Sequence, residues 1–281
     1  MISWLRAGVA LALLAACGHH IGNGTGDGDA NGGGDGDGGI VATIDAPPFS
    51  GVCNPDGPQC SNCRDDDGDG FIDGFDPECT GPSDKDERTF ATGIPGDNKD
   101  PVEQDCFFDG DSGAGNDGCN IHVCCLLGAR TVEECTIGQN RYNPKDCPPP
   151  IGTMPLSATC IKTCGKLTPP GCDCFGCCTI CDPVNHDCHD ILINPADSVG
   201  CGPTTLGDPT KCLACVKNTQ CGSSQCGGQS CILCPGQDPS TLPPSCNGTT
   251  MCSTGQQSCA ADGICAEGAY CSSGCCIGVI L

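Results

Sequence analysis

The sequence predicts a small disulfide-rich fold that is mostly irregular, with a few short β-hairpins, no large hydrophobic core and a disordered N-terminal tether. Leu, Ile, Val and Phe make up about 17% of the 281 residues, below the roughly 20% typical of chains that fold around an apolar core. The 43 Gly, 23 Pro and net charge of −23 also favour disorder. The 33 Cys, about 12% of the chain, exceed the roughly 8–10% that marks a disulfide scaffold. Cross-links are therefore expected to replace much of the core.

The same composition argues against several classes of function. A chain with so little apolar material is a poor candidate for a large enzyme or a membrane channel, and an acidic chain repels the phosphates of nucleic acid. Neither G-x-S-x-G, H-E-x-x-H, a Walker motif nor a Rossmann motif occurs in the sequence. We therefore predict no catalysis. A hydrolytic triad that uses His122, His186 or His189 stays open, because triads are defined in space rather than in sequence.

Residues 1–16 have the pattern of a signal peptide, with Arg6 before a short apolar run. That run is too short to span a bilayer. The sequence Leu14-Ala15-Ala16-Cys17 resembles the lipobox of bacterial lipoproteins. The resemblance implies cleavage before Cys17 and a lipid on its sulfur, and Gly18 in place of Asp implies an outer-membrane or cell-surface location. Without Cys17, 32 cysteines remain for pairing, an even number that suits an oxidising compartment.

Residues 17–50 are predicted to be a lipidated cysteine followed by a Gly/Asp-rich flexible linker. Half of residues 18–39 are glycine, and no apolar periodicity interrupts them. A Gly-rich coil of this length has a root-mean-square span of roughly 30 Å. We expect this linker to hold a folded head away from the membrane. The membrane is thus one predicted partner of the protein, through the lipid anchor.

The densest acidic stretch, residues 65–76, lies in a predicted calcium-binding module over residues 51–147. Its spacing matches a twelve-residue calcium loop, with a glycine at position 6. Alternate oxygen ligands in such a loop converge on one hard cation, and adjacent carboxylates without a cation oppose folding. The predicted calcium ligands are Asp65, Asp67, Asp69, the backbone carbonyl of Phe71, Asp73 and Asp76. A solvated acidic turn is the alternative.

The last position of this loop is Asp76, which is followed by Pro77-Glu78-Cys79, and no amphipathic helix flanks the loop. The loop is EF-hand-like, but a helix-loop-helix sensor is not expected. The pattern resembles the thrombospondin type 3 repeat and related bacterial aspartate-rich modules. This resemblance implies a disulfide that ties the loop, from Cys60 or Cys63 to Cys79.

A second, weaker calcium candidate lies between Cys106 and Cys119. Its oxygen ligands would be Asp109, Asp111, Asn116 and Asp117. Their spacing matches no known calcium loop, and an acidic turn without a cation is the alternative. The order of features over residues 60–119 resembles cysteine-rich surface lipoproteins of myxobacterial type.

Two further cysteine-rich modules are predicted, over residues 148–200 and 201–281, after the Pro148-Pro149-Pro150 break. Strands are expected at residues 157–163, 190–194 and 274–280. Residues 172–181 contain two C-x-x-C units, which in a cytosolic protein would indicate zinc or an iron–sulfur cluster. After an export signal, disulfides are the expected state.

Two other C-x-x-C pairs, Cys212/Cys215 and Cys231/Cys234, lack the strand-to-helix setting of redox-active thiols. His186 and His189 have a spacing that would suit a mixed metal site, although exposed loop positions are the simpler interpretation. The vicinal pair Cys275-Cys276 loosely resembles that of knottin or chitin-binding miniproteins, but the spacing of the C-terminal cysteines matches neither family.

These patterns favour a calcium-binding, disulfide-rich lipoprotein with a structural or adhesive role. Its expected cofactor is calcium, and its partners are the membrane, through the lipid anchor, and a surface or matrix protein or polysaccharide. No nucleic-acid partner is expected. The alternative is a thiolate protein that sequesters zinc or copper, followed by a knottin-like inhibitor or a carbohydrate-binding module.

Overall fold

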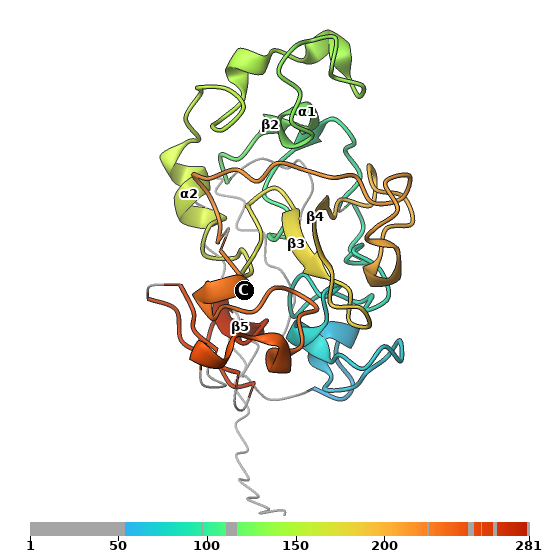
Figure 1. Cartoon of the computed structure of the whole chain (residues 1–281), viewed down its shortest axis with the longest axis vertical. Helices are drawn as coiled ribbons and strands as arrows, with labels where there is room; N and C mark the ends of the chain where they lie inside the picture. Colours follow the sequence, from blue (N-terminus) through green and yellow to red (C-terminus); the bar gives the residue numbers. More distant parts are fainter. Residues whose placement is uncertain are drawn as a thin grey trace, which may run out of the picture. The chain divides into compact units, whose positions relative to one another are not determined.

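The structure is a computed structural model of the chain, shown in Figure 1. It describes residues 54–279 except for 97, 111–116, 224, 247–249, 254 and 261–262. The predicted signal peptide, the lipidation site Cys17 and the linker lie outside these residues. In the described part, no helix is long and apolar enough to cross a membrane.

The described residues confirm the predicted fold class. Their helices are α1 (Val123–Leu126), α2 (Ala158–Thr163) and several short 3-10 turns. Three antiparallel strand pairs are present: β1 (Glu103–Gln104) with β2 (Ile121–His122), β3 (Cys177–Cys181) with β4 (Cys188–Leu192), and β5 (Ala269–Ser272) with β6 (Cys275–Gly278). The longest pair, β3 and β4, lies near the centre of Figure 1. Strands this short are not stable alone, so other contacts must hold them.

Disulfide bonds supply those contacts. All 31 described cysteines are disulfide-bonded, and 30 of them pair with one another in 15 bridges. The bridges Cys106–Cys164 and Cys119–Cys160 join residues on either side of position 148. The segments before and after the triple-proline run are therefore covalently linked.

The strand predicted at residues 157–163 is wrong, because this segment forms α2. Ser157 caps the helix, and its Oγ accepts a hydrogen bond from the Cys160 N–H at 3.0 Å. Cys160 and Cys164 lie one helical turn apart on the same face, and each forms one of the two bridges above. Capping and cross-linking thus override the strand preference of Ile161. The predictions at 190–194 and 274–280 overlap β4 and β6.

The buried apolar side chains form small clusters rather than one large core. In the largest, Phe175, Leu126 and Leu192 are buried among several cystines. A second contains Phe90, Ile180 and Ile191, also mixed with cystines. In the described residues, sulfur therefore supplies much of the volume that aliphatic side chains supply in other folds.

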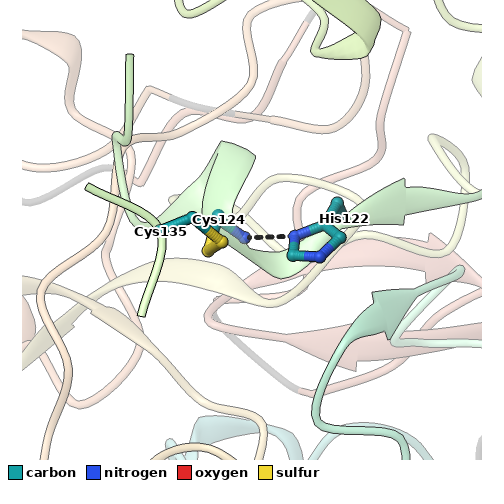
Figure 2. A group of neighbouring side chains, drawn as sticks. All are labelled: His122, Cys124 and Cys135. Carbon is teal, nitrogen blue, oxygen red and sulfur yellow. Dashed lines mark hydrogen bonds between the residues drawn. A yellow bond between two sulfur atoms is a disulfide. The ribbon is translucent and has the colours of Figure 1, made fainter. Parts of the chain in front are cut away.

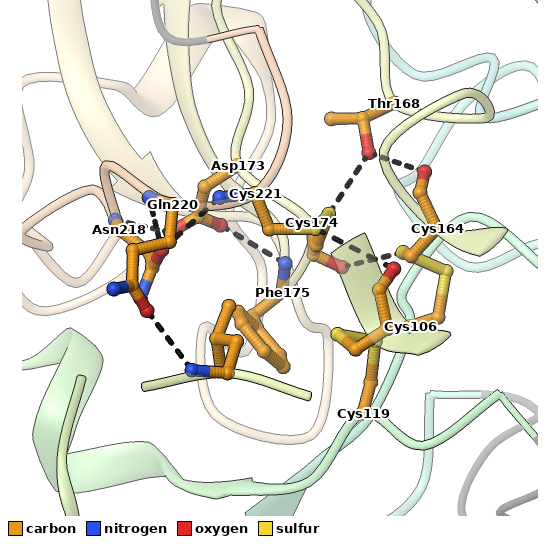
Figure 3. The surroundings of a disulfide bond; sticks show 12 residues. Cys106, Cys119, Cys164, Thr168, Asp173, Cys174, Phe175, Asn218, Gln220 and Cys221 are labelled. Carbon is orange, nitrogen blue, oxygen red and sulfur yellow. Dashed lines mark hydrogen bonds between the residues drawn. A yellow bond between two sulfur atoms is a disulfide. The ribbon is translucent and has the colours of Figure 1, made fainter. Parts of the chain in front are cut away.

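A buried carboxylate organises the centre of the cysteine-rich part (Figure 3). Asp173 is fully buried. Its Oδ1 accepts hydrogen bonds from the N–H groups of Phe175 and Cys177, each at 3.0 Å, and its Oδ2 accepts one from the Asn218 N–H at 2.7 Å. Burial raises the pKa of Asp173 to about 6, opposed by these hydrogen bonds. The side chain holds together the turns that carry three bridges, Cys172–Cys178, Cys174–Cys221 and Cys177–Cys215.

Candidate metal centre

The structure brings three of the predicted calcium ligands together. Asp65, Asp67 and Asp69 each offer a carboxylate oxygen within 4.8 Å of the others, and all three side chains are exposed. Gly68 and Gly70, with φ of 87° and 100°, turn the loop in a conformation that other residues rarely adopt. The Gly70 N–H donates to Asp65 at 3.1 Å. We call these three carboxylates the outer group.

Two further predicted ligands, Phe71 and Asp73, take part in hydrogen bonds that involve the backbone of the loop. The Phe71 N–H donates to Asp69 at 2.8 Å, and the role of the Phe71 carbonyl as a ligand stays a prediction. Asp73 is engaged elsewhere: both of its carboxylate oxygens lie 3.1 Å from the Cys63 N–H, which donates to them. The Asp73 carboxylate therefore serves as a cap for the chain entering the loop and is not part of the outer group.

Asp76, the last predicted ligand, is buried beside a residue that the sequence did not single out. Asp76 Oδ1 accepts a hydrogen bond from the Glu78 N–H at 2.8 Å. Asp76 and Glu78 are only 3% and 2% exposed. Asp76 Oδ2 and Glu78 Oε2 are buried, and no described residue outside this pair donates a hydrogen bond to either of them. The two carboxyl groups share a side-chain hydrogen bond, which needs a proton on one of them. Burying two adjacent carboxylates is costly when both are ionised.

The carboxylates of Asp76 and Glu78 also lack a compensating positive charge. None of the three ion pairs seen among the described residues includes either of them. Burial raises the pKa of Asp76 to about 8. Burial, the charge of Asp76 and the side-chain hydrogen bond to Asp76 together raise the pKa of Glu78 to about 11. A bound cation would remove this conflict, because it would pair the oxygens and balance their charge.

Glu87 is a third buried acid that the sequence did not reveal. Its Oε1 accepts from the Asp73 N–H at 3.0 Å and its Oε2 from the Asp66 N–H at 2.6 Å. A carboxylate oxygen of Glu87 also lies within 4.8 Å of one of Asp76. The only sequence signal for Glu87 was the acidic character of residues 84–87. The spacing of these acids matches no calcium-binding loop.

A disulfide ties the ends of this acidic segment. Cys60 pairs with Cys79, which is one of the two pairings expected, and Cys63 takes part in another disulfide. The segment also packs on the C-terminal hairpin. The Ser273 N–H donates to the Gly74 carbonyl at 2.7 Å. The loop is thus held from both sides before any ion binds.

The second calcium candidate is only partly described. Asp111 and Asn116 lie outside the described residues. Asp109 and Asp117 have carboxylate oxygens within 4.8 Å of each other. Asp117 accepts the N–H groups of Cys106 at 3.2 Å and Cys119 at 2.8 Å, so it positions the two bridged cysteines. Calcium at this turn stays a prediction.

A cluster of His122, Cys124 and Cys135 looks like a metal site but has no free ligand (Figure 2). The two sulfurs form a disulfide. The Cys124 N–H donates to His122 Nδ1 at 3.2 Å, and His122 Nε2 lies 3.1 Å from the Gly138 carbonyl. The histidine is therefore a helix cap, and both of its ring nitrogens are engaged.

The C-x-x-C units form no internal bridges in the described residues. Cys174 and Cys177 bond to Cys221 and Cys215, while Cys178 and Cys181 bond to Cys172 and Cys188. The same holds for the other two pairs, whose bridges are Cys201–Cys212, Cys177–Cys215, Cys231–Cys246 and Cys226–Cys234. These pairings offer no dithiol for exchange chemistry. His186 and His189 are exposed at the β3–β4 hairpin.

Comparisons with protein-family models, with curated proteins and with solved structures found no match. The acidic segment is therefore interpreted from its own geometry. Exposed and buried carboxylates lie close together there, and the three ion pairs of the described residues include none of them. Such an oxygen-rich donor set suits a hard divalent cation.

Proposed function

We propose that this protein is a calcium-binding, disulfide-rich surface lipoprotein with a structural or adhesive role and no catalytic activity. The observation that carries the proposal is the outer group, three carboxylates that lie within 4.8 Å of one another. The buried carboxyl group of Asp76, whose charge interacts with Asp69, has no basic partner in the three ion pairs of the described residues. The calcium loop would use Asp65, Asp67, Asp69 and Asp76, with Phe71 giving a backbone carbonyl. Asp73 is left out of this set because it caps the Cys63 N–H.

Calcium is favoured over other cations by the chemistry of the donors. All side-chain donors are carboxylates, which suit hard ions rather than zinc or copper. Magnesium demands near-ideal octahedral geometry and keeps several waters, whereas calcium accepts six to eight oxygens in flexible arrangements. We expect an affinity of about 10⁻⁴–10⁻³ M, the range of extracellular calcium modules.

The proposed role of the ion is to let the acidic segment fold. Bound calcium would balance carboxylates that have no described ion-pair partner and would fix the loop against the C-terminal hairpin. The N-terminal lipobox pattern supports attachment to the membrane through Cys17, and the Gly/Asp-rich linker would keep the head clear of the lipid. The rigid, cross-linked head would then present its surface to a protein or polysaccharide partner.

A thiolate protein that sequesters zinc or copper is the alternative. Metal binding by cysteine requires free thiolates, and each described cysteine is in a disulfide, which favours the calcium proposal. Intact mass spectrometry of the mature protein separates the two. A mass lowered by about 32 hydrogens relative to the reduced chain supports the disulfide form, with the count following from the even number of cysteines. Free thiols carrying metal would support the alternative.

Calcium titration with loop variants tests the proposal. The Asp65→Asn and Asp67→Asn variants should bind calcium more weakly by at least tenfold, because each removes a charged ligand. Asp56→Asn is the matched control, since Asp56 is exposed and lies outside the acidic cluster. Equal calcium affinity in the loop variants and the control would rule out the proposed site.

A further inference from the structure

The acidic segment contains two groups of carboxylates rather than one. The outer group is exposed at the tip of the loop. Asp76 and Glu87 belong to a separate, buried group whose ligand atoms lie within 4.8 Å of one another; its third member, Cys79, is bonded to Cys60 and offers no thiolate. The charge of Asp76 interacts with both Asp69 and Glu87. Asp76 therefore lies between the two groups.

We propose a second cation position beneath the loop, formed by the carboxylates of Asp76, Glu78 and Glu87, which takes a hard divalent ion such as calcium. The inference rests on the proposed function, because both positions are assigned the same ion. It adds two ligands, Glu78 and Glu87, and a second ion that the loop spacing does not predict. We call this the inner position.

The donor oxygens at the inner position can be used for coordination. Asp76 and Glu78 are buried and share a side-chain hydrogen bond. A divalent cation would take the place of the proton that this bond needs. Glu87 accepts two backbone N–H groups, but an ionised carboxylate has about four lone-pair sites. It therefore retains capacity for a cation. Calcium would complete its coordination with backbone carbonyls or water.

The surroundings of the inner position differ from those of the outer group. Tyr270 of β5 is buried, and its hydroxyl donates to the Cys60 carbonyl at 2.9 Å. Its ring packs on the acidic loop, because a Cβ added at Gly74 would lie 2.9 Å from Tyr270 Cε1. Burial and the charges of Asp73, Asp84, Asp76 and Glu87 raise the pKa of Tyr270. An ion at the inner position would therefore lie near Tyr270, under the C-terminal hairpin, whereas the outer group opens to solvent.

The first test counts ions on the oxidised full-length chain, by equilibrium dialysis against calcium. We expect two ions per chain, falling to one in Glu78→Gln and Glu87→Gln. Glu133→Gln is the matched control, because Glu133 is exposed and remote in sequence; it should retain two. One ion in the unmodified chain would overturn the inner position and leave the proposed function standing. An unmodified chain that binds no ion would overturn both.

A second test does not depend on the folding of the Glu variants. Terbium replaces calcium and emits when a nearby tyrosine is excited, and the chain has only two tyrosines. Tyr142 packs against His122 in another part of the structure. Tyr270→Phe should therefore remove most of the sensitised emission while the ion count stays at two, and Tyr142→Phe should leave the emission unchanged. Emission that survives in Tyr270→Phe and disappears in Tyr142→Phe would overturn the inner position.

Discussion

The hydroxyl of Tyr270 donates a hydrogen bond to the carbonyl of Cys60, 2.9 Å away, across 210 residues of sequence. This bond joins strand β5 to the disulfide that closes the acidic segment, since Cys60 pairs with Cys79. Next to it, the Gly74 carbonyl accepts the Ser273 N–H. The C-terminal hairpin and the acidic loop therefore share one buried contact surface. A substitution in one should change the stability of the other.

Gly74→Ala should separate these two segments. A Cβ at residue 74 would lie 1.7 Å from the Cys271 carbonyl oxygen, so the backbones must move apart. We expect a loss of about 1–3 kcal/mol in stability, typical of overpacking, together with weaker calcium binding. Gly81→Ala is the control, because its Cβ would meet nothing within 4 Å. Identical thermal unfolding of the two variants would contradict the tight contact.

Removing the Cys60–Cys79 bridge with paired serine substitutions should weaken calcium binding. The bridge closes a loop across 19 positions, and chain entropy alone gives about 3 kcal/mol for loops of this size. The predicted calcium ligands lie inside this closed loop, so without the bridge their ordering should cost more conformational entropy. The matched control removes Cys181–Cys188, a short bridge at the β3–β4 hairpin, and should leave calcium affinity unchanged. Isothermal titration calorimetry measures both; an equal effect on calcium affinity would refute the coupling.

Asp173→Asn should be strongly destabilising. Asp173 accepts three backbone N–H groups, and an amide has one acceptor oxygen where the carboxylate has two. At least one buried donor is then left without a partner, at a cost of about 1–3 kcal/mol. Urea unfolding under oxidising conditions measures the loss. Asp187→Asn, at an exposed position, is the control, and a similar midpoint for both variants would contradict the assigned role.

Asp197 should make the protein less stable as the pH rises. Burial, followed by the charge of Asp100, raises the pKa of Asp197 to about 7, above its usual 3.8. The folded state therefore holds a proton that the unfolded state releases, so stability falls between about pH 4 and pH 7. Asp197→Asn removes this dependence and should melt at a higher temperature than the unmodified chain at pH 8. A lower melting temperature at pH 8 would show that the ionised carboxylate is favourable.

The sequence predicted the fold class well because composition alone limits the choices. With few aliphatic residues and many cysteines, a cross-linked and irregular fold was the expected outcome. The pairing of the cysteines was not predictable from the sequence. It depends on contacts between distant segments, such as those between α2 and the turns that carry Cys106 and Cys119. The same contacts turned the segment after Ser157 into a helix.

Only the ligands of the candidate site that come from one continuous loop were predictable from the sequence. The regular spacing of Asp65, Asp67 and Asp69 identified the outer group, because these ligands come from one tight loop. Asp73 fits the same spacing but caps Cys63 instead. The sequence spacing did not identify Glu78 or Glu87 as ligands, because their burial depends on a disulfide and on a hairpin almost 200 residues away.

Thermal unfolding of the oxidised full-length chain, after metal removal and again with calcium, tests the central claim most directly. At about 100 times the dissociation constant, one bound ion adds about 2.7 kcal/mol of stability. We predict a melting temperature that rises by several degrees with calcium, returns on chelation, and does not respond to calcium when Asp65 and Asp67 are both replaced by Asn. An unmodified, metal-free chain whose melting temperature is the same with and without calcium would contradict the account.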